Sequence, residues 1–195
     1  MLNKERMIAE FSELVAIDSP SFVERELANA LKCKLTDIGF QVTEDDAGKY
    51  YGSDCGNIYG FLEGELEGEP LLFSSHMDTV APAIGKKAIL HPDGRITSAG
   101  DTVLGADDVA GIVSILEAVR SLREEGAPHR SIEVLFPIAE EPYAKGSKAF
   151  DYSQLKSKEA YVLDLDGKVG RAAYTAPSIL SFCATIKGCH EAWQD

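Results

Sequence analysis

The stretch Leu71-Leu72-Phe73-Ser74-Ser75-His76-Met77-Asp78-Thr79-Val80 runs from an apolar segment directly into an imidazole and a carboxylate. An apolar run of this kind is typical of a strand buried on both faces, as in a parallel sheet. His76 and Asp78 stand two positions apart, so on extended backbone their side chains point to the same side. A metal-binding histidine usually needs such a carboxylate to fix its tautomer. The stretch therefore predicts a buried strand that ends in a chemically active site.

Three acidic clusters follow at the ends of further predicted elements. Asp107-Asp108 precedes an apolar helical pattern over 109–122, Glu140-Glu141 follows a strand predicted over 131–138, and Asp164 lies at the end of a strand predicted over 161–165. Helices are also predicted over 3–17 and 24–38, with short strands over 40–43, 57–62 and 178–187 and a hairpin over 88–97. This alternation predicts an α/β sandwich with a mixed, largely parallel sheet flanked by helices.

The composition limits the partners that the chain can have. The 195 residues carry a formal net charge of -13, which argues against nucleic acid and anionic membranes as partners. No apolar run is long enough to span a bilayer and the N-terminus lacks an apolar signal core, so we expect a cytoplasmic protein. None of the four cysteines forms a CxxC pair, which leaves zinc-finger and redox motifs without support.

In open α/β sheets, functional sites form where strands end and loops begin. Convergence of these clusters at one sheet edge would gather one imidazole and several carboxylates. Carboxylates cannot all stay ionised in a partly buried pocket without a compensating cation. One or two divalent metal ions would supply that charge, and the donor types suit zinc, manganese or cobalt better than calcium or magnesium. In the Glu140-Glu141 pair, one side chain can bind metal while the other takes a proton from the attacking water.

Four motifs together resemble the M20 family of co-catalytic metallopeptidases, and its peptidase T-like branch of tripeptide aminopeptidases in particular. The matching stretches are Ser75-His76-Met77-Asp78-Thr79-Val80, Gly105-Ala106-Asp107-Asp108-Val109-Ala110-Gly111, Ala139-Glu140-Glu141 and Tyr161-Val162-Leu163-Asp164. The resemblance implies an aminopeptidase for short peptides that uses two divalent metal ions, with zinc as the expected metal. It also implies that Glu140 is the general base and that Asp78 holds a metal-bound histidine. The implied metal ligands are His76, Asp107 as the bridging residue, Glu141 and Asp164.

The resemblance also implies a domain organisation. Residues 1–175 would form the N-terminal part of the catalytic domain, and 176–195 would begin an α+β lid that dimerises in a full-length form. Family chains are about twice as long, so we expect the sequence to be an N-terminal fragment with little or no activity. Its last residues, 189–195, depart from the lid motif, and Tyr143 stands where the family often has glycine.

Two other functions remain open at this point. One is an amidohydrolase of the same family that removes acyl groups from amino acids. The other is a non-catalytic remnant with an incomplete metal site. Each motif also has a purely structural interpretation: His76 as a buried core histidine, Asp107-Asp108 as helix caps and Glu140-Glu141 as a solvated pair. Asp166 is the rival to Asp164 as the ligand at the end of the last strand.

Overall fold

The computed structural model describes residues 1–176, 178–180 and 182–188. The chain divides into two units, Met1–Asp164 and Leu165–Asp195. In the second unit, the described residues are exposed and form neither helix nor strand. The strand predicted over 178–187 is therefore wrong for 178–180 and 182–187, and position 181 lies outside the described residues. The tail predicted to depart from the lid motif, 189–195, also lies outside them.

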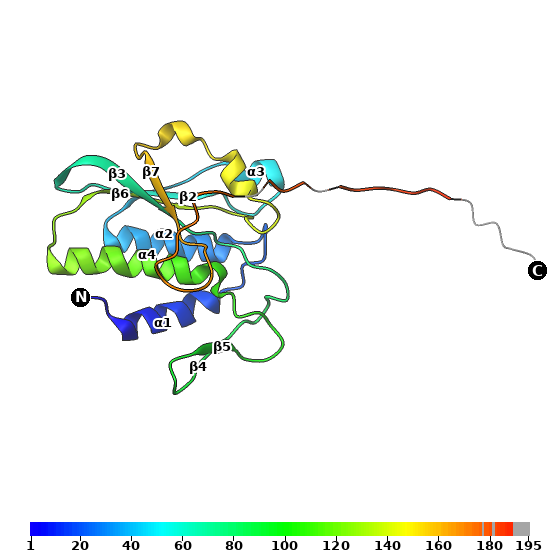
Figure 1. Cartoon of the computed structure of the whole chain (residues 1–195), viewed down its shortest axis with the longest axis horizontal. Helices are drawn as coiled ribbons and strands as arrows, with labels where there is room; N and C mark the ends of the chain where they lie inside the picture. Colours follow the sequence, from blue (N-terminus) through cyan, green and yellow to red (C-terminus); the bar gives the residue numbers. More distant parts are fainter. Residues whose placement is uncertain (177, 181, 189–195) are drawn as a thin grey trace, which may run out of the picture. The chain divides into compact units, whose positions relative to one another are not determined.

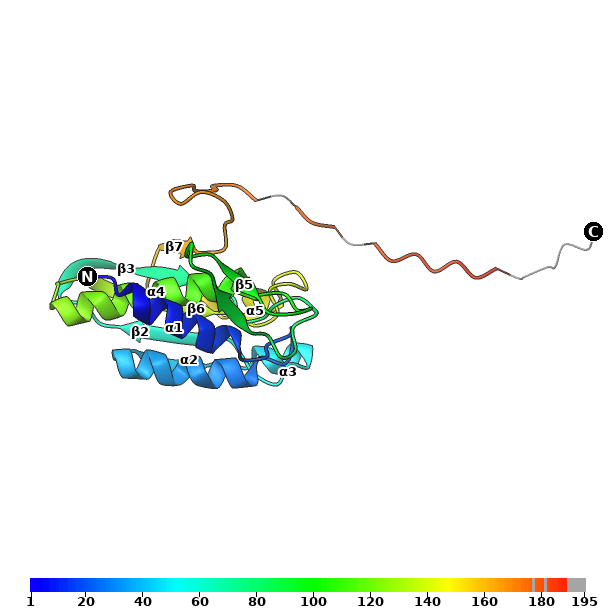
Figure 2. The same ribbon diagram turned by 90° about the horizontal axis from the view of Figure 1, so that it is seen from below.

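Three helices cover one face of the first unit's main sheet (Figure 1; Figure 2). They are α1 (Lys4–Val15), α2 (Arg25–Ile38) and α4 (Ala106–Glu125). In α2 the buried Leu27, Leu31 and Leu35 recur every four residues, which places them on one helix face. Gly39 ends α2 at a φ of 108°, a left-handed conformation that favours glycine. The predicted helices over 3–17, 24–38 and 109–122 are confirmed.

The main sheet contains five strands within the described residues, in the order β1-β2-β6-β3-β7. The pairs β3–β6 and β3–β7 are parallel, whereas β1–β2 and β2–β6 are antiparallel. Four strands therefore run in one direction and only β2 runs against them, which confirms the mixed, largely parallel sheet. Their bounds are β1 (Gln41–Glu44), β2 (Ile58–Leu62), β3 (Leu66–Ser74), β6 (Arg130–Phe136) and β7 (Glu159–Val162).

The core lies mainly between the sheet and the three helices. On β6, Ile132, Val134 and Phe136 pack into this main core, while Leu135 joins a smaller cluster with Leu72 and Phe150 on the opposite face. The chain segment that carries α5 (Lys145–Ala149) and the 3-10 helix η1 (Tyr152–Gln154) lies over that opposite face (Figure 1).

Burial of β3 differs from the prediction. Leu72 and Ser74 are buried, but Leu71 and Phe73 are only half-buried, and residues 66–69 are exposed. Phe73 stacks on the ring of Tyr161 at a centroid distance of 5.7 Å, and Tyr161 belongs to a strand whose four residues are all exposed. The apolar run is therefore fully buried on one face only.

Smaller elements complete the unit. The predicted hairpin is present as β4 (Ala88–Leu90) and β5 (Ile96–Ser98), which form a separate two-stranded sheet. Helix α3 (Ala47–Tyr51) was not predicted. Like α5, it has only five residues, which is too short for a clear apolar period.

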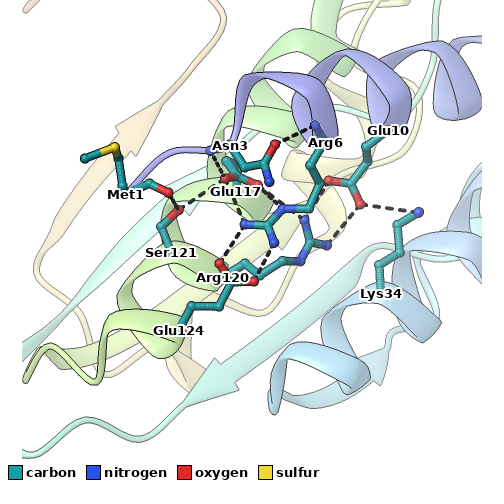
Figure 3. A network of polar contacts seen from close by, with 9 residues as sticks. All are labelled: Met1, Asn3, Arg6, Glu10, Lys34, Glu117, Arg120, Ser121 and Glu124. Atoms are coloured by element: carbon teal, nitrogen blue, oxygen red, sulfur yellow. Dashed lines mark hydrogen bonds and ion pairs between the residues drawn. The ribbon is translucent and has the colours of Figure 1, made fainter.

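A polar network joins α1 to α4 (Figure 3). The fully buried Glu117 carboxylate accepts hydrogen bonds from Arg6 Nε at 2.6 Å and from the backbone N–H of Asn3 at 2.6 Å. Arg120 pairs in turn with the buried Glu10 of α1. A buried carboxylate is tolerated when donors satisfy it in this way, so the network fixes how the two helices pack.

Candidate metal centre

His76 is the centre of the candidate site. It lies two residues beyond the end of β3, and its ring is almost completely buried. The ring Nε2 lies 2.9 Å from Oδ1 of Asp107 and 4.0 Å from Oδ2 of Asp164. The ring Nδ1 lies 3.3 Å from Oδ1 of Asp78, without the alignment of a hydrogen bond. The carboxylates of Asp78 and Asp107 therefore stand at opposite nitrogens of one imidazole.

Strand register explains why these distant residues meet. Ser74 of β3 is paired with Leu135 of β6 and with Val162 of β7, and all three strands run in the same direction. The chain leaves each strand at the same edge of the sheet, so His76, the segment that follows β6 and Asp164 come out side by side. The N–H of Leu163 still donates to the carbonyl of Ser74, at 2.9 Å, which holds Asp164 close to that edge.

The two neighbouring aspartates at the start of α4 serve different tasks. Both have non-helical φ and ψ angles, so regular helix begins only after them. Asp107 is largely exposed and turns its carboxylate toward His76. Asp108 is buried, accepts a hydrogen bond from Ser75 Oγ at 2.6 Å and receives the N–H of Gly111 at 3.3 Å. The capping interpretation thus holds for Asp108, while Asp107 belongs to the candidate site.

Asp78 links the imidazole to the Glu140-Glu141 pair. Its Oδ1 accepts the backbone N–H of Glu140 at 2.8 Å, and its Oδ2 accepts that of Glu141 at 3.2 Å. Ser21 Oγ donates to the same Oδ2 at 2.6 Å. One buried carboxylate therefore sets the position of His76 relative to both glutamates.

All six residues predicted for the site come together. Potential ligand atoms of His76, Asp107 and Glu141 lie within 4.8 Å of one another, and the same holds for His76, Glu140 and Asp164. Glu140, expected from the sequence to act as the base, therefore also lies within reach of a ligand position.

The crowding of carboxylates in the candidate site raises the pKa values of several of them. Burial raises the pKa of Asp164 to about 6 and that of Asp108 to about 7, and neighbouring aspartates add to both shifts. Burial and the charge of Asp107 likewise raise the pKa of Glu141. Burial disfavours a charged His76, but the carboxylates of Asp78 and Asp107 outweigh it and raise its pKa to about 10. A cation in this place would relieve the repulsion among the carboxylates.

The donor set fits a divalent transition metal. It offers one imidazole and several carboxylate oxygens, which are ligands that zinc accepts. The buried Nδ1 of His76 has no aligned hydrogen-bond partner, although Asp78 is beside it. A metal at Nε2 would require a proton on Nδ1, and Asp78, 3.3 Å away, is the carboxylate that would accept a hydrogen bond from this N–H.

Three residues around the site, Ser21, Glu24 and Asn57, were not predicted from the sequence. Glu24 and Asn57 are completely buried, and each accepts a backbone N–H from the segment that carries the glutamate pair. No sequence pattern singled them out, because Glu24 resembles an ordinary residue at a helix start and Asn57 an ordinary residue before a strand. Their burial is a property of the fold.

The fold and the donor set define an α/β protein with a candidate site for divalent metal ions. A family model described as peptidase family M28 matches residues 57–179, and the chain belongs to that family. The matching model is described as M28, whereas the sequence motifs resemble M20, so the match supports the prediction of a hydrolytic peptidase and leaves the M20 assignment a prediction.

Several known proteins are similar to the chain. It is 40% identical over 188 residues to YqjE of Bacillus subtilis, which is described as an uncharacterized protein. The aligned region covers 96% of this chain and 50% of that protein. It is 32% identical to peptidase T of Serratia proteamaculans, over 74% of this chain and 41% of that protein. The crystal structure of aminopeptidase PepT from Bacillus cereus has a TM-score of 0.84 at 44% identity, covering 87% of this chain and 45% of that chain. A tripeptidase structure from Staphylococcus aureus has a TM-score of 0.84 at 36% identity, covering 87% and 46%.

These likenesses confirm the predicted fold class. The chain spans about half the length of the curated relatives it matches. No helix in the described part of the chain has the length and apolar character needed to cross a membrane.

Proposed function

We propose that the chain forms the N-terminal part of a metal-dependent aminopeptidase of the M20, peptidase T-like type, which hydrolyses short peptides in the cytoplasm. The observation that carries the proposal is the meeting of one imidazole and five carboxylate side chains at the edge where β3, β6 and β7 end. The names of the relatives, peptidase T, PepT and tripeptidase, support tripeptides as the substrate class.

In this proposal His76, Asp107, Glu141 and Asp164 would hold two divalent ions, and Asp107 would be a ligand of both. Zinc is the expected metal, with manganese or cobalt as alternatives. When bound, the metal ions lower the pKa of water and polarise a peptide carbonyl. Asp78 keeps His76 in one tautomer and orientation. Glu140 removes the proton of the attacking water and delivers it to the leaving amine.

The proposal includes the organisation of the longer protein. Residues 1–175 belong to the catalytic domain, and 176–195 begin a lid through which a full-length form dimerises. A complete site would then draw on parts of the protein beyond these residues. We therefore expect only weak hydrolysis by this chain alone.

A pair of variants separates base from ligand. Glu140→Gln should keep metal binding, measured by calorimetry with Zn²⁺ and Co²⁺, but lower tripeptide hydrolysis by about 10²–10⁴-fold if Glu140 is the base. Glu141→Gln, by contrast, should lower both tripeptide hydrolysis and metal affinity. Because Glu140 also lies near His76 and Asp164, a loss of metal affinity in Glu140→Gln would instead assign it as a ligand.

Substrate class is tested with the same protein. Hydrolysis of trialanine above a metal-only blank, followed over hours, supports the peptidase. Faster hydrolysis of N-acetyl amino acids would favour the amidohydrolase. Metal binding with no turnover of either substrate would contradict catalysis by this chain and favour the non-catalytic remnant.

A further inference from the structure

Four consecutive backbone N–H groups around the glutamate pair donate to buried side chains instead of to neighbouring strands. The N–H of Ile138 donates to Asn57 Oδ1 at 3.0 Å, and that of Ala139 donates to Glu24 Oε1 at 2.9 Å. The N–H groups of Glu140 and Glu141 donate to the two oxygens of Asp78. Side chains thus accept the N–H groups of the segment that carries the candidate base and ligand, while its carbonyl groups accept N–H groups of residues 144–146.

The buried backbone N–H groups of this segment require hydrogen-bond acceptors. β6 ends at Phe136, so the residues that follow have no ladder partner, yet Ile138 and Ala139 are completely buried. A buried N–H without an acceptor is costly, so each needs one. Ala139 has a φ of 46°, a left-handed conformation that a non-glycine residue adopts rarely. Specific acceptors are what hold the chain in this conformation.

Glu24 supplies the acceptor at the centre of this segment. Its side chain is completely buried at the start of α2, far from Ala139 in the sequence. Its Oε1 also accepts a hydrogen bond from the N–H of Phe22 at 3.0 Å, and its Oε2 accepts one from the Ser53 hydroxyl at 3.1 Å. Within the described part of the chain no ion pair joins Glu24 to a cation. Two of the three hydrogen bonds of its carboxylate therefore fix loop backbone, at Phe22 and Ala139, and the third comes from the Ser53 hydroxyl.

Asn57 joins the two ends of the same loop, at Ile138 and Gly146. Its Nδ2 donates to the carbonyl of Gly146 at 3.0 Å, while its Oδ1 receives the N–H of Ile138. The N–H of Gly146 returns to the carbonyl of Ile138 at 3.0 Å. Residues 138 and 146 are thus held together, and Glu24 fixes the position between Ile138 and the glutamates.

We propose that Glu24 is a positioning residue for Glu140 and Glu141, and that it acts through the Ala139 amide. The proposal rests on the proposed function for the meaning of the glutamates, but its geometry does not depend on catalysis. What matters is an acceptor oxygen at this place, so glutamine should replace Glu24. In Glu24→Gln, the amide oxygen can accept both N–H groups, and the NH₂ group can donate to Ser53 Oγ.

The test compares Glu24→Gln and Glu24→Leu with the matched control Glu117→Leu. Glu117 is also a fully buried carboxylate with several donors, but it joins α1 to α4. Hydrogen exchange of the metal-free proteins is followed by NMR, and the rates at 138–141 are divided by that of Val134 in β6. We expect this ratio to rise at least tenfold at Ala139 and Glu140 in Glu24→Leu, and to stay within threefold of wild type in Glu24→Gln and Glu117→Leu.

Metal binding gives a second readout. Calorimetry with Co²⁺ should show an affinity about 10–100-fold lower in Glu24→Leu, as for other residues that support a metal ligand. The control and Glu24→Gln should bind like wild type. Glu24, Asp54 and Cys55 also lie within reach of a common ion, so loss of one bound ion with unchanged amide exchange would overturn the proposal.

The two readouts separate this proposal from the proposed function. A wild-type chain that hydrolyses no peptide, with the exchange pattern as expected, would count against the peptidase and leave the positioning role supported. An exchange ratio in Glu24→Leu equal to that of Glu117→Leu would refute the positioning role, whatever the activity.

Discussion

At the scale of single residues, a glycine allows the start of α4 to approach the sheet. A side-chain Cβ on Gly111 would lie 2.8 Å from the carbonyl oxygen of Leu163 and 2.7 Å from Ser75 Oγ. Such distances are too short for a carbon atom, so either the helix or the strand ends would have to move. The close approach is what lets Asp107 reach His76 across the edge of the sheet.

We predict that Gly111→Ala lowers the free energy of unfolding by about 1–3 kcal/mol, the usual cost of overpacking. It should also weaken Co²⁺ binding, because Asp107 moves with the helix start. Urea unfolding and calorimetry measure the two effects. Ser114→Ala is the control, because Ser114 is exposed on the same helix and should change stability by less than about 0.5 kcal/mol. Wild-type stability in Gly111→Ala would show that the helix start can shift freely.

The sequence predicted the six site residues because they directly follow or precede strongly patterned elements. The residue pattern alone does not distinguish Asp107 from Asp108, because that depends on backbone angles at the helix start, and only the family resemblance named Asp107 as the ligand. Glu24 and Asn57 were beyond prediction for another reason. Their role arises from contacts with residues 81 to 115 positions away, and only the folded chain brings these together.

At the scale of elements, the contact between α1 and α4 combines apolar packing with charge. Prediction of both helices succeeded because their apolar residues recur at helical spacing. The ion pairs between them were not predicted, because Glu117 lies on the buried face of a helix whose pattern is mainly apolar, and nothing in that pattern indicates its partners. Hydrogen bonds from Arg6 and Asn3 outweigh burial and lower the pKa of Glu117 to about 2 (Figure 3).

This shift predicts how stability depends on pH. A carboxyl group whose pKa is lower in the folded state stabilises the protein above its unfolded value of about 4.5, and this contribution is lost as the pH falls toward 2. Glu117→Gln should therefore cost about 1–3 kcal/mol at pH 7. The difference from wild type should shrink between pH 4.5 and pH 2, measured by urea unfolding at several pH values.

Glu13→Gln serves as the control for this series. Glu13 is exposed and pairs with Lys34 at 3.0 Å, so its replacement should cost only about 0–1 kcal/mol at any of these pH values. A difference between wild type and Glu117→Gln that stays constant down to pH 2 would mean that the charge of Glu117 does not stabilise the fold.

At the scale of the whole molecule, regular structure is confined to the first unit in the described part of the chain. All named helices and strands lie between Lys4 and Val162. In the second unit, apolar side chains such as Val169, Tyr174 and Phe182 are almost completely exposed. Exposed apolar groups bury no area and so give no hydrophobic stabilisation. The main core, by contrast, draws on all three long helices and on the sheet.

We therefore predict that a chain of residues 1–168 unfolds with the same free energy as a chain of residues 1–176, within about 0.5 kcal/mol. Urea unfolding followed by circular dichroism should also give the same m-value, because m reports the surface exposed on unfolding. Shortening to residues 1–155 is the contrasting case. It removes β7, which pairs with β3, and it also removes Asp164. That chain should lose several kcal/mol and its Co²⁺ binding. A loss above about 1 kcal/mol in the 1–168 chain would show that residues after 168 contribute to the stability of the first unit.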